Sequence, residues 1–228
     1  MTARRSSGPR TSRSDGRPLR RQGEATRAKL LDAALPALQE KGIHATRIDD
    51  VVRVAGVSHG TFYLYFANKE ELIRALAERC ADEADAVAAA LPPISADAEG
   101  RVVLRAWLAD YLEFYRRYGV VIRIWAENQV SDRTLARLGT KSFGRIASTV
   151  HTSMSASASA ATKVKAERVE LRATALLAMV ERFAYTFTSR SLGWTDDQVL
   201  DTLATLVHRG WFGGAAADAR PARLTPGG

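Results

Sequence analysis

The sequence predicts an all-α protein with two parts, an N-terminal unit of three helices and a larger C-terminal block of helices. From Gly23 onward, apolar residues recur at the three- and four-residue spacing of amphipathic helices, and no segment keeps the apolar–polar alternation of a strand. Capping residues, glycines and prolines interrupt this pattern where helices would end. With 228 residues, the chain is long enough for a small domain joined to a larger one.

The first helix is expected from about Glu24 to Lys41, and Gly42 is expected to end it. Its apolar face is formed by residues at positions i, i+3, i+4 and i+7, which are Leu31, Ala34, Leu35 and Leu38. Pro36 lies inside this helix, where it removes a backbone hydrogen bond and is expected to cause a kink.

A short helix is expected next, at about residues 47–55. Thr46 and Asp49 have the spacing of a capping box at its start. Gly56 follows it and is expected to make a turn.

Two further helices complete this part of the chain. Ser58 is placed to cap a second short helix that reaches about Phe66. Asn68, followed by Lys-Glu-Glu71, is placed to cap a longer helix that reaches about residue 90. The prolines at 92–93 are expected to end this longer helix.

The C-terminal block is expected to begin with a helix from Asp97. Its apolar stripe is Val103, Trp107, Tyr111, Phe114 and Tyr118. Gly119 is expected to break this helix and to leave a short helical piece at 120–128. A serine-capped helix is expected over 131–150, followed by a Ser/Ala-rich loop or a frayed helix end at 153–159.

Two more helices are expected before the C-terminus. A long one should cover about 163–191. A capping box formed by Thr195 and Gln198 should open the last helix, which ends near 211–213. Both carry apolar residues on more than one side, so each needs more than one partner.

The net charge of +8 is unevenly distributed along the chain. Residues 1–21 contain seven arginines against one aspartate, whereas residues 22–79 contain eight basic and eight acidic side chains. A Gly/Ser/Pro/Arg-rich segment of this kind cannot bury a core. We therefore expect a disordered basic arm over 1–22, a three-helix unit over 23–70, a helical block over 71–213 and a disordered tail over 214–228.

Several classes of protein are excluded by composition. The single cysteine, Cys80, permits no intramolecular disulfide, and no cysteine or histidine has metal-ligand spacing. The basic N-terminus is not followed by an apolar stretch, so it is not a secretory signal. The most apolar segment, 171–187, is interrupted by charged residues and is too short to cross a bilayer. We expect a cytoplasmic protein without a metal, a cofactor or a membrane partner.

The segment from Thr46 to Lys69 has the pattern of a helix-turn-helix. It contains two short helices around a glycine turn, with one apolar face. Helices of this length are unstable alone and must pack as a unit. In a helix-turn-helix, the second helix enters the DNA major groove. The alternative is that these helices are ordinary corners of a bundle.

The residues of this segment resemble the DNA-binding domain of the TetR (tetracycline-repressor-like) family of transcriptional regulators. The similarity lies in Ala-Gly-Val-Ser at 55–58, Gly-Thr-Phe-Tyr at 60–63, Tyr-Phe at 65–66 and Asn-Lys-Glu-Glu-Leu at 68–72. It covers about residues 24–75, with the helix-turn-helix at about 47–66. The remaining residues resemble the family only in being helical and of suitable length. Pro36 departs from the family's uninterrupted first helix.

The resemblance implies which residues face DNA. The matching positions that would contact bases and phosphates are Ser58, His59, Gly60, Thr61 and Tyr63, and Lys69 matches a phosphate-contacting lysine. Thr46 and Arg47 begin the supporting helix, where free backbone N–H groups suit a phosphate. Tyr65 is expected to bind phosphate through its hydroxyl. The alternatives are core packing for Tyr65 and a merely solvated side chain for Lys69.

Physical chemistry adds detail to these expectations. His59 can donate a hydrogen bond to guanine, and Gly60 permits a close approach to DNA. Leu64 either contacts thymine methyl groups or is simply an exposed leucine. Phe62 and Phe66 should anchor the recognition helix to the core. The basic arm either follows the DNA backbone or is only a solubilising tail.

The second block is expected to bind a small molecule and a second copy of the chain, as the family does. Aromatic residues on inner stripes could enclose a largely apolar effector, and the candidates are Trp107, Tyr111, Phe114, Trp125, Phe143 and Phe183. For any single one of them, an ordinary core residue is the favoured interpretation. The resemblance implies that the last two helices form the homodimer interface, and the candidates are Leu176, Val180, Leu203, Leu206, Val207 and Trp211.

These expectations together favour a ligand-responsive repressor that binds a palindromic, double-stranded operator as a dimer and is released by a small molecule. An activator or dual regulator of the same fold, and an architectural protein that uses only its basic arm, remain open alternatives. A helical enzyme is disfavoured. Acidic residues such as Glu113 and Glu181 exist, but nothing has the spacing of a nucleophile and base, a glycine-rich phosphate loop or a metal cluster.

Overall fold

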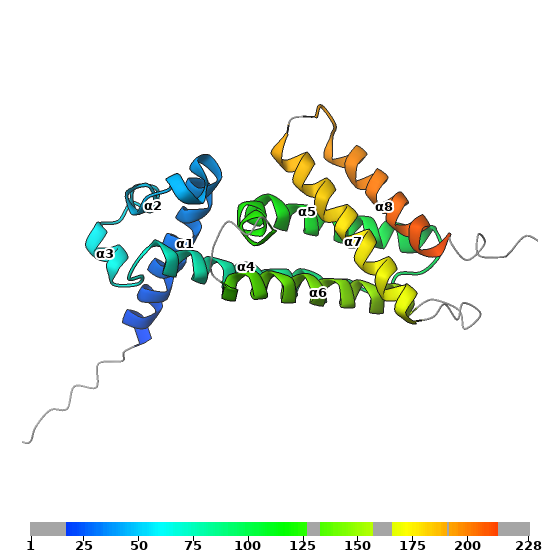
Figure 1. Ribbon diagram of the computed structural model, residues 1–228, viewed down its shortest axis with the longest axis horizontal. Helices are drawn as coiled ribbons and strands as arrows, with labels where there is room; N and C mark the ends of the chain where they lie inside the picture. Colours follow the sequence, from blue (N-terminus) through cyan, green and yellow to red (C-terminus); the bar gives the residue numbers. More distant parts are fainter. Residues whose placement is uncertain (1–16, 127–132, 157–165, 191, 214–228) are drawn as a thin grey trace, which may run out of the picture.

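The computed structural model describes residues 17–126, 133–156, 166–190 and 192–213, and these form eight α-helices and no strand. The expected all-α fold is confirmed. The helices are α1 (Arg17–Ala45), α2 (Ile48–Ala55), α3 (His59–Tyr63), α4 (Lys69–Ala89), α5 (Ala98–Ala126), α6 (Arg133–Ser155), α7 (Ala166–Ser189) and α8 (Asp196–Phe212). Figure 1 shows a small block of α1–α3 at one end and a larger block of α5–α8 at the other, with α4 running from the first into the second.

Helix α1 is longer than its sequence pattern indicates. It begins at Arg17 rather than near Glu24, so residues 17–22, which we expected in the disordered arm, are helical. Gly42 leaves the helical conformation with φ at +74°, which is the interruption expected there. Pro36 is accommodated on the exposed face of the helix, while the neighbouring Leu35 is buried. Burial of the apolar face maintains the helix despite the proline.

The cap of α2 differs from the expected capping box. Arg47, not Thr46, precedes the helix, and the Oδ2 atom of Asp50 accepts a hydrogen bond from the Arg47 N–H at 3.0 Å. Thr46 cannot serve as the cap because its hydroxyl donates inward, to the carbonyl oxygens of Ala37 and Gly42 at 3.1 and 2.7 Å.

The other expected caps of the small block are present. The Ser58 hydroxyl accepts the Thr61 N–H at 3.1 Å, and the Asn68 side chain accepts the Glu71 N–H at 2.8 Å. Helix α3 ends at Tyr63, earlier than expected, although the next turn still buries Phe66.

Helix α5 is continuous through Gly119, so the expected break at this glycine is wrong. The side chains around it explain the continuity, since Tyr118, Val120 and Val121 are all buried. Gly119 also lies against its own helix neighbour: a Cβ atom there would be 3.2 Å from the Tyr115 ring. A helical glycine costs about 1 kcal/mol relative to alanine, and burial of three large side chains outweighs it.

The ends of the last three helices are set by tertiary contacts and caps. Helix α6 extends past the expected end at Val150, because the Ser153 hydroxyl donates to the Leu91 carbonyl at 3.1 Å and Met154 is fully buried. The capping box of Thr195 and Gln198 opens α8 as expected. Part of the expected Ser/Ala-rich loop, and all of the tail at 214–228, lies outside the described residues.

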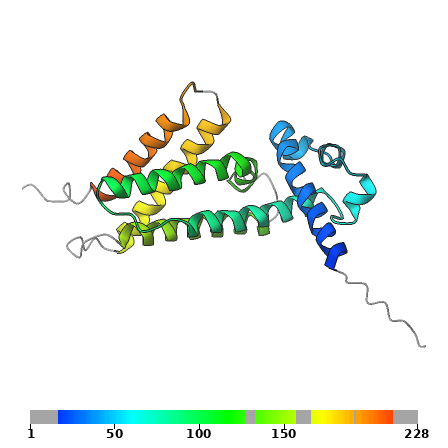
Figure 2. The ribbon, with the colours of Figure 1, turned by 180° about the vertical axis from the view of Figure 1, so that it is seen from behind.

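The second block is layered. Figures 1 and 2 show α4 and α6 running side by side on one edge, α5 packed behind them, and α7 and α8 as a pair on the opposite edge. One hydrophobic core runs from α1 to α8. Ion pairs also join the blocks: the Asp32 carboxylate of α1 lies 3.0 Å from Arg79 of α4 and 3.1 Å from Arg117 of α5.

Candidate nucleic-acid interface and effector pocket

Helix α3 is held by two phenylalanine anchors. Phe62 and Phe66 are buried and their ring centroids lie 5.7 Å apart, as their i, i+4 spacing predicts. Between α2 and α3, Gly56 adopts φ of +60°, a conformation that glycine adopts without steric cost. The short helix is therefore fixed to the core on one side, and its opposite side is free.

The free side of α3 faces solvent at the outer end of the molecule (Figure 1). His59 and Gly60 are exposed, and the exposed fractions of Tyr63 and Leu64 are 56% and 79%. A leucine with this exposure is unusual for a residue next to a core helix. We call the surface formed by His59, Gly60, Thr61, Tyr63 and Leu64 the α3 face.

Gly60 has no internal reason to be glycine. A Cβ atom at this position would have the Ser58 hydroxyl, at 3.7 Å, as its only neighbour within 4 Å, and its backbone is not in the left-handed region. Alanine would also favour the helix by up to about 1 kcal/mol. The absence of a side chain at this point therefore suits a close approach from outside the molecule.

His59 is exposed but has a partner. Its Nε2 atom lies 2.5 Å from the Oδ1 atom of Asp49, on the neighbouring α2. This contact brings the two helices of the motif together at the surface. Arg47 is exposed at the start of α2, as its expected role requires.

Thr46 and Lys69 are placed differently from expectation. Thr46 is 2% exposed, and its N–H donates to the Gly42 carbonyl at 3.2 Å, so neither its hydroxyl nor its N–H is available to a phosphate. The Lys69 ammonium donates to the carbonyls of Ile43 and Thr46 at 3.0 and 3.1 Å. The lysine thus ties the end of α1 to the start of α4, with one N–H remaining.

Tyr65 fits the core-packing alternative. It is half-buried and packs against the hydrophobic core, and its hydroxyl lies close to Gly23 of α1, 3.6 Å from the position of a Cβ atom there. The side chain therefore points toward α1 and away from the α3 face.

A charge cluster under α2 was not found by sequence reasoning. Asp50 is buried, and its Oδ1 atom lies 2.6 Å from Lys41 and 3.6 Å from Arg53. The hydrogen bonds from Lys41 and from the Arg47 N–H lower the pKa of Asp50 to about 2. The carboxylate therefore stays ionised at physiological pH and links α1 to the first turn of α2.

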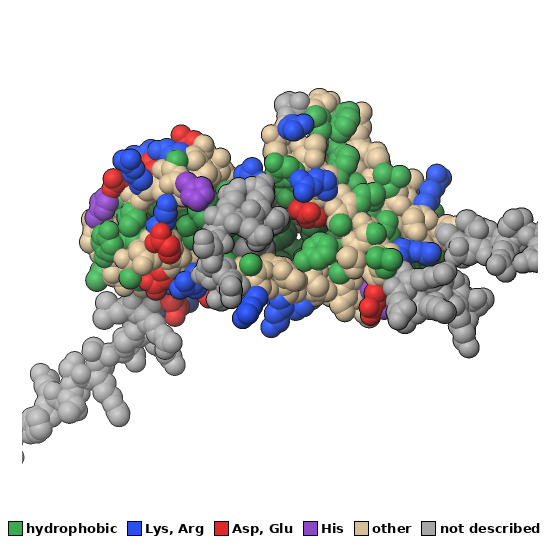
Figure 3. Space-filling model, in the orientation of Figure 1, with side chains coloured by type: hydrophobic (Ala, Val, Ile, Leu, Met, Phe, Trp, Pro, Cys, Tyr) green, Lys and Arg blue, Asp and Glu red, His purple; other side chains and the backbone are tan. Residues whose placement is uncertain are grey.

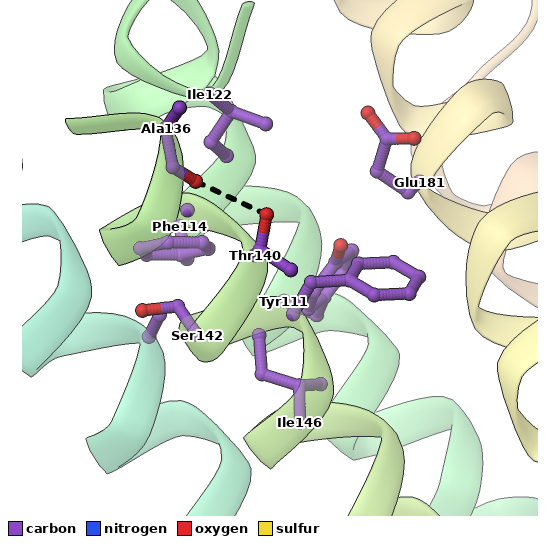
Figure 4. Close-up of a pocket in the computed structure, with 11 residues that line it drawn as sticks. Tyr111, Phe114, Ile122, Ala136, Thr140, Ser142, Ile146 and Glu181 are labelled. Carbon is purple, nitrogen blue, oxygen red and sulfur yellow. Dashed lines mark hydrogen bonds between the residues drawn. The ribbon is translucent and has the colours of Figure 1, made fainter. Parts of the chain in front are cut away.

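The second block contains an apolar pocket of about 280 Å³ between α4, α5, α6 and α7 (Figure 4). Tyr111, Phe114 and Phe143 line it, as expected. The other lining residues are Ala84, Ile122, Ala136, Gly139, Thr140, Ser142, Ile146 and Glu181. Ile122 and Ile146 continue the helical stripes that identified the aromatic residues, so the same periodicity could have found them.

Two of the expected pocket residues, Trp107 and Phe183, do not form the pocket wall. Trp107 stacks on Tyr111 and donates its indole N–H to the Val87 carbonyl at 2.8 Å, so it lies behind the wall. Phe183 stacks on Trp194, at a centroid distance of 6.2 Å, on the other side of α7. The side chain of Trp125 lies outside the described residues.

Polar groups are few in the pocket wall. The Thr140 hydroxyl donates to the Ala136 carbonyl at 3.1 Å, as Figure 4 shows, and Ser142 accepts from Arg145 at 3.3 Å. The Glu181 carboxylate accepts the Tyr115 hydroxyl at 3.3 Å. Burial, with the negative charge of Glu181, raises the pKa of Tyr111 well above its ordinary value, so this tyrosine is neutral.

The expected dimer residues divide into two groups. Val180, Leu203, Val207 and Trp211 are buried inside the chain, so the expectation that they form an interface is wrong. Helix α8 turns Leu203, Val207 and Trp211 inward, where it packs on α5, and the Trp211 indole donates to the Met154 carbonyl of α6; Val180 is buried on α7. Leu176 is half-buried above Gly210, while Leu206 is 51% exposed.

Other apolar side chains are exposed near Leu206. Leu171 and Met179 of α7 and Trp194 before α8 have substantial exposed area. Figure 3 shows hydrophobic side chains gathered over α7 and α8. We call the surface formed by Leu171, Met179, Trp194 and Leu206 the α7–α8 face. Sequence periodicity identified these helices as apolar on several sides but did not identify which side is free.

Neither a metal site nor a membrane span is found among the described residues. No group of three or more His, Cys, Asp or Glu side chains there could hold a metal ion. No described helix is both long enough and apolar enough to cross a membrane.

Comparison with known proteins found similarity in the N-terminal block. Residues 30–76 match the family model of bacterial regulatory proteins of the tetR family. The N-terminal part of this chain is therefore similar to tetR-family regulators, over about a fifth of its length. The match covers the second half of α1, all of α2 and α3, and the first turns of α4, which are the elements that form and support the α3 face.

Curated relatives of this chain are similar over the same region. The chain is 50% identical over 50 residues to the uncharacterised regulator YvdT of Bacillus subtilis, covering 22% of this chain and 26% of that protein. It is 34% identical over 74 residues to the regulator TtgR of Pseudomonas putida, covering 32% and 35%. It is 27% identical over 107 residues to EthR of Mycobacterium tuberculosis, covering 47% and 50%. The matches thus span at most half of these relatives.

Solved structures are similar over most of the chain. FadR of Bacillus subtilis, solved in complex with stearoyl-CoA, has a TM-score of 0.61 at 16% identity, over 80% of this chain and 98% of that one. The regulator MbdR of Azoarcus sp. CIB has a TM-score of 0.62 at 17% identity, over 81% and 98%. The second block therefore also has the fold found in TetR-like regulators, while its residues have diverged.

Proposed function

We propose that this protein is a ligand-responsive transcriptional regulator of the TetR family, a repressor that binds a palindromic operator as a homodimer and is released by a small molecule. The α3 face is the observation that carries the proposal. It is rigidly anchored from below by Phe62 and Phe66, and it exposes a histidine, a tyrosine and a leucine around a glycine that the fold does not require. Such a regulator acts in the cytoplasm, where bacterial DNA lies.

The proposed contacts follow the exposure of each side chain. Helix α3 enters the major groove, with His59 and Thr61 toward base edges and Leu64 toward thymine methyl groups. Tyr63 and Arg47 contact phosphates, and the Ser58 cap fixes the first turn. Lys69 contributes through its positive charge and its remaining N–H. Thr46 and Tyr65 support the surface from inside and are not part of the proposed interface.

DNA binding can be tested with the full chain and a fragment of its own promoter region. We expect fluorescence anisotropy to show binding that is at least about 10³-fold tighter than to a scrambled duplex of equal length at physiological salt. Equal affinity for both duplexes would contradict sequence-specific regulation and would favour an architectural role. A reporter gene behind the same promoter separates repression from the alternative, activation.

The basic arm is proposed to strengthen this binding. The segment 22–79 has no net charge, whereas affinity for DNA depends largely on phosphate neutralisation. Deletion of residues 1–16 removes four arginines against one aspartate and leaves α1 intact. We expect weaker binding to all duplexes and a smaller dependence of affinity on salt. An unchanged salt slope would show that the arm is only a tail.

Dimerisation is proposed to occur through the α7–α8 face. Several large apolar side chains exposed on one pair of helices are typical of an interaction site. We expect size-exclusion chromatography with light scattering to give a dimer for the wild type and a monomer for Leu206→Glu, with weakened operator binding. Val102→Glu is the control, because this valine is also exposed but lies outside the α7–α8 face. A dimeric Leu206→Glu protein would place the interface elsewhere.

The pocket is proposed to receive the effector. Its wall includes Ala84 of α4, and α4 begins at Lys69, directly after the motif. A ligand that favours a different position of α4 would move the two α3 faces of a dimer out of register with the operator.

A further inference from the structure

Among the described residues that line the pocket, one side chain is charged. Eleven such residues form the wall; Glu181 is the charged one, and none of the eleven is a lysine, arginine or histidine. Figure 4 shows Glu181 on α7, across the pocket from Ile122 of α5 and from Ala136 and Thr140 of α6. The electrostatic character of the wall is therefore negative.

The charge of Glu181 is not neutralised within the described chain. Its only hydrogen-bond partner there is the neutral Tyr115 hydroxyl, and no ion pair joins it to a described cation. Arg123 and Arg182, which are close enough to influence Tyr115, lie over the Tyr185 ring, at 5.8 and 5.2 Å from its centroid. A half-buried carboxylate beside an apolar pocket gains most from a cationic partner.

The aromatic wall favours the same kind of partner. Tyr111, Phe114 and Phe143 line the pocket that Glu181 borders. The face of an aromatic ring attracts cations, and the attraction increases when water is excluded. A ligand with a carboxylate or phosphate in this space would meet the Glu181 charge, and the described lining residues offer it no basic side chain.

We propose that the effector is a lipophilic cation, with a compact apolar body against the rings and an ammonium or similar group next to Glu181. This inference rests on the proposed function, because it takes the pocket as the effector site. The cavity of about 280 Å³ lies at the lower end of the range for small-molecule sites, roughly 300–1,000 Å³, so the body is compact. The positive charge of this proposed effector is opposite to the negative charge of the stearoyl-CoA bound by the structural neighbour FadR.

The test compares three probes of similar shape by isothermal titration calorimetry: the 4-phenylbutyltrimethylammonium cation, its neutral isostere with a tert-butyl group, and 5-phenylpentanoate. The wild type, Glu181→Gln and Glu113→Gln are titrated with each probe. Glutamine keeps an oxygen that can accept the Tyr115 hydroxyl, so the variant should fold. Glu113 is the control, since it lies on α5 with a 75% exposed side chain and is paired with Arg116.

We expect the wild type and Glu113→Gln to bind the cation about tenfold or more tightly than the neutral isostere, and to bind the anion most weakly. In Glu181→Gln, the preference for the cation should disappear while the affinity for the neutral isostere is unchanged. The proposal is overturned if the wild type binds the neutral or anionic probe at least as tightly as the cation, if it binds no probe, or if the preference survives in Glu181→Gln.

The same protein samples distinguish this proposal from the proposed function. Binding of the ligand-free protein to its promoter fragment, measured by anisotropy, does not depend on the charge of the pocket. A protein that binds DNA specifically but fails the cation test loses only the assignment of the effector class. A protein that prefers the cation but does not bind DNA retains the ligand site and loses the role as a regulator.

Discussion

Gly60 and Leu64 are two residues whose side-chain size the fold of the chain does not require. Gly60 has no side chain, although the fold leaves room for one. Leu64 exposes a large apolar side chain, although the fold does not require one there. Both lie on the α3 face. Their placement is explained if this face is covered by the major groove.

Substitution of Gly60 by alanine should separate folding from DNA binding. The added methyl group meets only ordinary van der Waals contact with Ser58, and alanine favours the helix, so thermal stability should be unchanged or slightly higher. The same methyl group should obstruct the approach to DNA and weaken operator binding about tenfold or more, since overpacking costs about 1–3 kcal/mol. Anisotropy and thermal unfolding measure the two effects.

Gly144→Ala is the matched control for this substitution. Gly144 is also an exposed helical glycine, with no neighbour within 4 Å of a Cβ atom, but it lies on α6 in the second block. It should show the same small change in stability and no change in DNA affinity. Equal DNA affinity of Gly60→Ala and the wild type would remove the main support for the α3 face as the contact surface.

The sequence predicted the capping residues better than it predicted the roles of individual site residues. The caps at Ser58, Asn68 and Thr195 depend on local spacing, and all three are present. The roles of Thr46 and Lys69 depend on which way a side chain turns at the junction of α1, α2 and α4. Local spacing contains no information on that direction, because distant carbonyl groups determine it.

At the scale of elements, the start of α2 depends on Asp50 and the charges around it. The pKa of Asp50 is about 2, against an ordinary value of 3.8. A carboxylate with a lowered pKa stabilises the folded state above its ordinary pKa, and this contribution is lost as the pH falls through the folded-state value. We expect Asp50→Asn to destabilise the protein at neutral pH, with the difference from the wild type decreasing between about pH 4 and pH 2.

Urea unfolding of both proteins over this pH range measures the effect. Asp49→Asn is the control, because it removes a charge from the adjacent position of the same helix, where the side chain is 69% exposed. The pH-dependent difference should be much smaller there. A constant difference between Asp50→Asn and the wild type from neutral pH to pH 2 would show that the carboxylate charge is not what stabilises α2.

Helices α5, α7 and α8 show which features of a helix the sequence pattern does not predict. The presence and the apolar stripes of these helices follow from periodicity, but Gly119 did not break α5, because its neighbours are held by the core. Val180, Leu203 and Val207 have the pattern of an interface and are core residues. Periodicity finds the apolar sides of a helix, but it does not tell which of them packs within the chain.

At the scale of the whole molecule, the Asp32 carboxylate joins the two blocks in addition to the core that they share. Asp32 of α1 contacts Arg79 of α4 and Arg117 of α5, and Tyr118, next to Arg117, donates to Glu83 of α4 at 2.6 Å. The rings of Tyr111, Phe114 and Tyr118 continue from this cluster to the pocket, with centroid distances of 6.2 and 5.5 Å. A change in the pocket thus has a continuous path of contacts to the helix that supports α2.

Asp32→Asn should therefore weaken communication between the blocks without preventing DNA binding. Asp32 is remote from the α3 face, so the ligand-free variant should bind its promoter fragment within about twofold of the wild type. The ligand should weaken DNA binding less in the variant than in the wild type. Such coupling typically changes affinity by roughly 5–150-fold, and we expect this factor to fall several-fold. Anisotropy with and without the phenylbutyltrimethylammonium cation measures both. Asp196→Asn is the control, since Asp196 also pairs with an arginine of α5 and is equally exposed (53% against 54% for Asp32), but lies within the second block. If both variants respond to the ligand like the wild type, the signal does not pass through Asp32.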